Sequence, residues 1–296
     1  MALAAPPHFL AADLQLRFRP QREWVEGRGI LLIVGHFLSG VGAGAWLLAS
    51  LGCGLSGLAT GWGLLALSGL AHLLFLGRWT RFARMIARPH SSWISRGLLG
   101  MTLLLLAGGA YLALAFLGRA DSPAGQGLWW LSLLSAAWVL VYKGFVWASA
   151  KGIPLWNTPL LPVLYLTYGL RGGLAALLLV ALAQPHGGEL LVMETLKLWL
   201  GVSSDVLILT YLAVIRGTSL TAARSVQALL SGRAAPVFYA GVVLLGLVVP
   251  IALGGYSLLA SAGIPLLTVI GLASLLGDLA LLYAVARAGL YRPLPA

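Results

Sequence analysis

The sequence predicts an all-α integral membrane protein with eight transmembrane helices. Three observations support this fold class. First, only 9% of the 296 residues are charged, whereas a soluble domain carries roughly 25%. Second, 60% of the residues are hydrophobic and the mean hydropathy is +0.94, so too few polar residues remain to cover a water-facing surface. Third, the apolar residues form long runs without strict alternation, which argues against an outer-membrane barrel.

Each of eight apolar runs is long enough to cross a bilayer, which takes about 20 residues. Helices are the expected form, because every backbone polar group inside a bilayer needs a partner within the chain. The runs are 30–53, 57–77, 97–118, 127–149, 158–183, 188–214, 236–258 and 264–288. A tail (1–29) precedes them, a loop (151–157) separates two halves (30–150 and 158–290), and a short tail (291–296) follows.

The Lys and Arg residues predict the orientation. Sixteen of the nineteen fall in the two tails or in the loops on one side, and this count places Lys143 beside Lys151 at the end of the fourth span. The opposite loops hold Arg119. Because cations concentrate in cytoplasmic loops, we expect both termini to be cytoplasmic, in a bacterial inner (cytoplasmic) membrane. The net charge of +11 is spread over these loops and forms no stripe for nucleic acid.

Tryptophans and glycines add structural predictions. Trp24 and Trp156 fall near the predicted inner boundary, as expected of an interfacial aromatic belt. The run Gly40-Val-Gly42-Ala-Gly44 places small residues where another helix can approach closely. A nucleotide-binding glycine loop is disfavoured, because no strand precedes this run.

Ionisable residues inside spans are costly in lipid and are therefore candidate functional residues. From the rise per residue, His36 and His72 lie roughly 8–9 Å from the same membrane face, and Tyr142 lies at a similar or shallower depth. Three interpretations of this group stay open. It could hydrogen-bond a quinone headgroup, the two imidazoles could ligate a b-type haem, or each side chain could bond a neighbouring helix.

A second group lies deeper in the membrane. Arg171, Asp205 and Asp278 could form a proton path or a static ion pair, and we expect Arg171 to pair with Asp278 or Asp205. Glu194 and Lys197 stand three residues apart on one helix, which predicts a local pair.

Three sequence blocks resemble the polysulfide reductase membrane-subunit family, the NrfD-like anchors. They are H-L-L-F-L-G-R-W-T-R-F-A-R-M-I-A-R-P-H-S-S-W-I-S-R-G from His72 to Gly97, K-G-I-P-L-W-N-T-P-L-L-P-V-L-Y from Lys151 to Tyr165, and F-L-S-G-V-G-A-G-A-W-L-L-A in the first span. The resemblance covers most of the first five spans. The last three spans match in number and hydropathy alone.

The resemblance implies two four-helix bundles, no haem, and ubiquinone or menaquinone bound in the first bundle. It implies His36 as the quinone ligand of the first span and Tyr142 as the tyrosine near the quinone, and we expect His72 beside them. It also implies a four-cluster iron–sulfur subunit that feeds a molybdopterin (molybdenum or tungsten) catalytic subunit. The single cysteine, Cys53, cannot build an iron–sulfur cluster on this chain.

The family serves partners on either membrane face, and the charge bias predicts docking from the cytoplasm. The candidate docking residues are Arg78, Arg81, Arg84, Trp93 and Arg96. Three alternatives remain: a b-type haem membrane subunit, a purely structural anchor, and a secondary transporter. A transporter predicts helices broken at mid-membrane, for which Gly172-Gly173 and Pro250 are the candidate positions.

Overall fold

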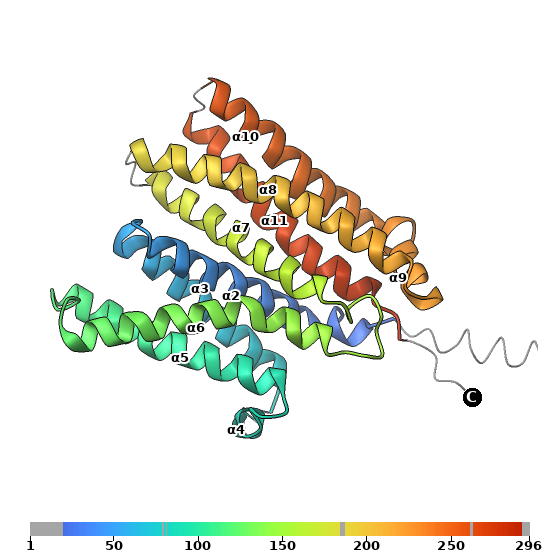
Figure 1. The fold of residues 1–296 in the computed structure, drawn as a ribbon, viewed down its shortest axis with the longest axis horizontal. Helices are drawn as coiled ribbons and strands as arrows, with labels where there is room; N and C mark the ends of the chain where they lie inside the picture. Colours follow the sequence, from blue (N-terminus) through green and yellow to red (C-terminus); the bar gives the residue numbers. More distant parts are fainter. Residues whose placement is uncertain (1–19, 79, 81, 184–186, 261–262, 292–296) are drawn as a thin grey trace, which may run out of the picture.

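The chain folds into long helices that lie side by side (Figure 1). The computed structural model describes residues 20–78, 80, 82–183, 187–260 and 263–291. Within them, eight helices are long and apolar enough to cross a membrane, and no strand is present. The spans are α2 (Gly29–Ala49), α3 (Gly54–Leu76), α5 (Trp93–Phe116), α6 (Pro123–Ala148), α7 (Leu160–Ala183), α8 (Gly187–Arg216), the continuous pair η3 (Val237–Val248) and α10 (Val249–Ala260), and α11 (Ile264–Ala288). The predicted all-α class and the number of spans are confirmed.

Two spans begin four residues before their predicted starts because polar caps precede the apolar runs. Ser92 accepts a hydrogen bond from the backbone N–H of Ser95 and so begins α5 at Trp93. Ser122 accepts from the N–H of Gly125, and Pro123 occupies the first turn of α6. Both are standard N-terminal signals, which a search for apolar residues alone passes over.

Three short helices were not predicted. They are η1 (Arg22–Trp24), α4 (Phe82–Ile86) and α9 (Leu220–Leu230). Ser219 caps α9 by accepting from the N–H of Ala222. These helices are too short to cross a bilayer, so they leave the number of spans unchanged.

Helices α2 and α7 contact each other at the centre of the molecule. A Cβ atom on Gly44 would collide with the carbonyl of Gly169, and one on Gly42 would lie 2.8 Å from the carbonyl oxygen of Gly61 in α3. The predicted close approach at this glycine run is therefore confirmed.

The helix breaks predicted for a transporter are absent at the two candidate positions. Helix α7 runs unbroken through Gly172 and Gly173, and Pro250 lies at the continuous junction of η3 and α10.

Both ends of the described chain meet at one end of the molecule, where Pro20 and Leu290 form an antiparallel backbone bridge. Helices α4 and α9 lie at this same end (Figure 1).

One cation in the topology count was misplaced. Lys143 is 2% exposed within α6, so it belongs to the protein interior, and fifteen of the nineteen Lys and Arg residues support the orientation. The cytoplasmic placement of this end stays a prediction.

Candidate functional site

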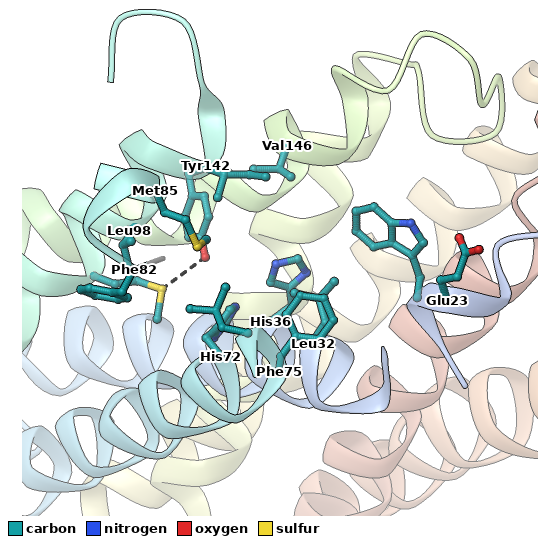
Figure 2. A pocket seen from close by; sticks show the side chains of 14 residues that line it. Glu23, Leu32, His36, His72, Phe75, Phe82, Met85, Leu98, Tyr142 and Val146 are labelled. Atoms are coloured by element: carbon teal, nitrogen blue, oxygen red, sulfur yellow. Dashed lines mark hydrogen bonds between the residues drawn. The ribbon is translucent and has the colours of Figure 1, made fainter. Parts of the chain in front are cut away.

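A cavity of about 350 Å³ opens at the end of the molecule where the chain ends meet. Side chains from η1 and α2 to α6 line it (Figure 2). The structure brings all three predicted side chains, His36, His72 and Tyr142, to this one cavity. Its other walls are mostly apolar: Trp24, Leu32, Phe75, Leu76, Phe82, Met85, Ile94, Leu98, Met101 and Val146, with Glu23 at one edge. Such a lining, with few polar groups, is typical of a small-molecule site.

His36 is held in a single tautomer by Trp147. The indole Nε1 of Trp147 donates to Nδ1 of His36 at 3.2 Å. An indole N–H can only donate, so Nδ1 of His36 must be the nitrogen that offers a lone pair. In the neutral ring the proton then sits on Nε2. His36 therefore offers a hydrogen-bond donor.

His72 has the opposite tautomer. Its Nδ1 lies 2.8 Å from the carbonyl oxygen of Ser68, which can only accept, so Nδ1 carries the proton. Nε2 is left with a lone pair, and this atom is buried without a hydrogen-bond partner among the described residues. The two rings lie 5.4 Å apart. The pair thus combines one donor nitrogen and one acceptor nitrogen beside an apolar cavity.

Glycines make room for two of these side chains. A Cβ atom on Gly35 would lie 2.6 Å from ring atoms of His72, and a Cβ on Gly97 would collide with the ring of Tyr142. Any larger residue at either position would displace the side chain. The positions of His72 and Tyr142 therefore depend on glycines in the facing helices.

Tyr142 is buried and donates to the sulfur of Met101 at 3.3 Å, the contact drawn as a dashed line in Figure 2. A thioether is a weak acceptor. Ser39 also interacts with this hydroxyl, so a ligand oxygen in the cavity, which would be a better acceptor than the sulfur, would compete with both neighbours.

An aromatic cluster behind the cavity was missed from the sequence. The ring of Trp147 lies 4.3 Å from that of Trp156 and 5.2 Å from that of Trp24, centroid to centroid. Trp156 is fully buried, so the prediction that it belongs to an interfacial belt is wrong. One signal could have pointed to Trp147. It follows Lys143 by four residues, which puts both on the same face of α6.

A second polar site lies between α7, α8 and α11. Arg171 and Asp278 form an ion pair in which each side chain is 1% exposed, so the predicted pairing of Arg171 is confirmed with Asp278. The guanidinium also lies over the ring of Tyr168, 4.4 Å from its centroid. Asp205 does not bond to Arg171, and its buried Oδ1 has no hydrogen-bond partner among the described residues.

The predicted pair of Glu194 and Lys197 forms no direct ion pair among the described residues, and the two groups interact only at longer range. Glu194 accepts instead from the hydroxyl of Ser257 in α10, at 2.7 Å. The ammonium of Lys197 is buried and has no hydrogen-bond partner in the described part of the chain. Neighbouring helices, rather than spacing along α8, decide which groups meet.

The candidate docking residues fall into three groups. Arg78 and Arg84 are exposed, and Arg81 lies outside the described residues. Arg96 is used within the chain, because it donates to the carbonyls of Pro89 and His90 at 2.7 Å each and lies over the ring of Trp93. Docking stays a prediction, with Arg78 and Arg84 as the exposed candidates.

No group of His, Cys, Asp and Glu side chains within the described residues could hold a metal ion.

Comparison with known proteins gives two matches. The family model described as "Polysulphide reductase, NrfD" matches residues 28–293. The protein NrfD of Escherichia coli (strain K12) is 32% identical over 177 residues, which cover 57% of this chain and 54% of that protein. The match thus spans about half the length of this curated relative.

Proposed function

Because the chain belongs to the polysulphide reductase, NrfD family, we propose that it is the quinone-reactive membrane anchor of a multi-subunit oxidoreductase. Its proposed partners are a four-cluster iron–sulfur subunit and a molybdopterin catalytic subunit. The family match supports the role of membrane anchor, and the cavity beside His36 supports the quinone. The proposed location is the bacterial inner membrane with the cavity toward the cytoplasm, which an accessibility map of cysteines placed in the 77–96 loop would test.

The cavity suits a quinone because its apolar walls match the ring and its polar groups match the two oxygens. When bound, a quinone supplies two-electron, two-proton redox chemistry. His36 would donate its Nε2 proton to one oxygen, and the hydroxyl of Tyr142 is available as a second donor. The lone pair on Nε2 of His72 would accept a proton or a hydrogen bond. The site can therefore hold both the oxidised and the reduced form.

The same tautomers argue against a b-type haem between His36 and His72. Two axial imidazoles must each direct a lone pair at the iron. His72 has one free on Nε2, but the lone pair of His36 is on Nδ1, where it accepts the indole N–H of Trp147. Ligation by His36 would require breaking that buried bond or removing the ring's proton.

The single observation that supports the proposal most is this pairing of one donor and one acceptor nitrogen at an apolar cavity. We expect His72→Leu to weaken binding of decylubiquinone to the purified native complex by about tenfold, the effect of losing about one hydrogen bond. Quenching of tryptophan fluorescence can report binding, because Trp24 lines the cavity.

The matched control is His90→Leu. His90 is exposed in the turn between α4 and α5 and does not line the cavity, so this variant should bind decylubiquinone like the native protein. A dithionite-minus-air spectrum of the same sample provides the second test. Unchanged binding in His72→Leu, or a b-type haem band from this chain, would refute the quinone assignment.

A further inference from the structure

A small cavity lies between the two polar sites. Its volume is about 10 Å³, close to what a single water molecule needs. Lys143 of α6, Tyr165 and Tyr168 of α7, and Asp278 of α11 border it. All four residues are at most 4% exposed. The cavity therefore joins the half of the chain that holds His36 to the half that holds the buried ion pair.

Three polar atoms around this cavity have no hydrogen-bond partner among the described residues. They are the hydroxyl oxygens of Tyr165 and Tyr168 and Oδ2 of Asp278. Buried polar atoms in folded proteins are nearly always satisfied, and ordered water is the usual partner where side chains are not. The cavity has the volume and the polar partners for such a water.

Lys143 connects this cavity to the quinone-site helix. Its ammonium donates to the carbonyl of His36 at 2.8 Å, and it passes Gly40 so closely that a Cβ there would collide with the nitrogen. An ammonium has three donors, so others remain for a water in the cavity. On the far side, Asp278 is bonded through Oδ1 to Arg171, and its Oδ2 is left for the cavity.

We propose that one water molecule occupies this cavity and relays protons between Lys143 and Asp278. In the step, Lys143 gives one proton to the water and the water gives one of its own to Oδ2 of Asp278. A neutral amine and a carboxylic acid result, and no electron moves. The reverse step restores the two charges. The relay rests on the proposed function, because redox chemistry beside His36 is what would supply or consume the protons.

Other charged groups lie beyond Asp278. Lys197 is within electrostatic range of Asp278, Arg171 and Glu194, and Asp205 is within range of Arg171. The relay thus leads from the cavity at His36 toward the second half of the chain. In this scheme Asp278 receives the proton on Oδ2, while Arg171 donates to Oδ1 and holds the carboxylate in place. Neither residue needs to touch the quinone.

Two measurements test the relay. The first is a high-resolution density map of the native complex, in which a water should lie within hydrogen-bond distance of Lys143, Tyr168 and Asp278. The second compares turnover with decylubiquinol and binding of decylubiquinone in Lys143→Met and Tyr168→Phe. General acid–base groups contribute on the order of 10²-fold or more, so turnover should fall by about that factor in Lys143→Met and less in Tyr168→Phe, with binding unchanged.

Tyr211→Phe is the matched control. Tyr211 is fully buried, its hydroxyl donates to the carbonyl of Leu155 at 2.6 Å, and it does not line the cavity. Its loss should leave turnover unchanged. An empty cavity in the map, or native turnover in both relay variants, would overturn the relay. If the native protein fails to bind decylubiquinone, the proposed function fails instead, while the map still tests the water site. If a variant does not assemble, the map of the native complex still tests whether the water is present.

Discussion

The two polar sites of this protein differ in what their buried groups are bonded to. At the end where Pro20 and Leu290 meet, His36 and His72 stand beside an apolar cavity of about 350 Å³. Nearer the middle, Arg171 and Asp278 are bonded directly to each other, each 1% exposed. The first site therefore offers neutral hydrogen-bonding groups to a ligand. At the second site the two main charges neutralise each other, although Oδ2 of Asp278 has no hydrogen-bond partner among the described residues.

The difference follows from the cost of burial. A neutral imidazole nitrogen without a partner costs a few kcal/mol, but an unpaired ion in a low-dielectric interior costs far more. A ligand site must be stable while it is empty, so neutral groups such as His72 suit it. Charged groups are tolerated where a fixed partner such as Asp278 is supplied by a neighbouring helix.

The largest expected effect is therefore at the ion pair. Asp278→Ala leaves Arg171 buried without its partner, and such a change costs about 3–5 kcal/mol. We expect a matching loss of stability. It can be measured by heating the protein in detergent and determining the remaining folded fraction by size-exclusion chromatography. The double variant Arg171→Met/Asp278→Leu should recover most of the loss, because apolar residues of similar size leave no charge behind.

An exposed pair provides the control for this experiment. Arg22 and Glu26 lie 3.9 Å apart with side chains 65% and 60% exposed, and pairs of this kind contribute about 0–1 kcal/mol. Arg22→Ala should leave thermal unfolding nearly unchanged. If Asp278→Ala were no worse than Arg22→Ala, burial would not be what makes the Arg171 pair important.

A smaller effect is expected behind the cavity, at the bond that fixes the His36 tautomer. Trp147→Phe keeps an aromatic ring and removes the N–H that His36 accepts. The free energy of unfolding should fall by about 1 kcal/mol, the value of one hydrogen bond. Binding of decylubiquinone should weaken by about tenfold for the same reason, since His36 no longer holds its proton on Nε2 alone.

Trp156→Phe separates the two consequences. Trp156 lies in the same aromatic cluster, but its indole donates to the carbonyl of Val285 at 3.0 Å. This variant should lose similar stability and bind decylubiquinone normally. Equal binding in the two variants would mean that the tautomer of His36 does not matter for the ligand.

The fold could be predicted from the sequence because span length and hydropathy are local properties. The common depth of His36, His72 and Tyr142 could also be predicted, since it depends on the rise per residue alone. The error at α5 and α6 came from the capping serines, Ser92 and Ser122, which begin a helix before its apolar run does.

The direction in which each helix faces could not be predicted. Lipid and protein interior are both apolar, so the sequence of α6 does not reveal that Lys143 and Trp147 point inward. The same limit applies to pairings between helices. Glu194 bonds to Ser257, a contact that depends on the positions of α8 and α10 and leaves no trace in the spacing along either.

The smallest effect on stability is expected from Tyr142→Phe. The lost bond to the sulfur of Met101 is weak, so the free energy of unfolding should change by under about 0.5 kcal/mol, below the usual value of a hydrogen bond. Turnover with decylubiquinol should nevertheless fall, because the hydroxyl is available to donate to a ligand. Tyr111→Phe is the control, since Tyr111 packs on Trp129 away from the cavity. Lower stability with native turnover would make Tyr142 a packing residue, and the contrast with Asp278 would then disappear.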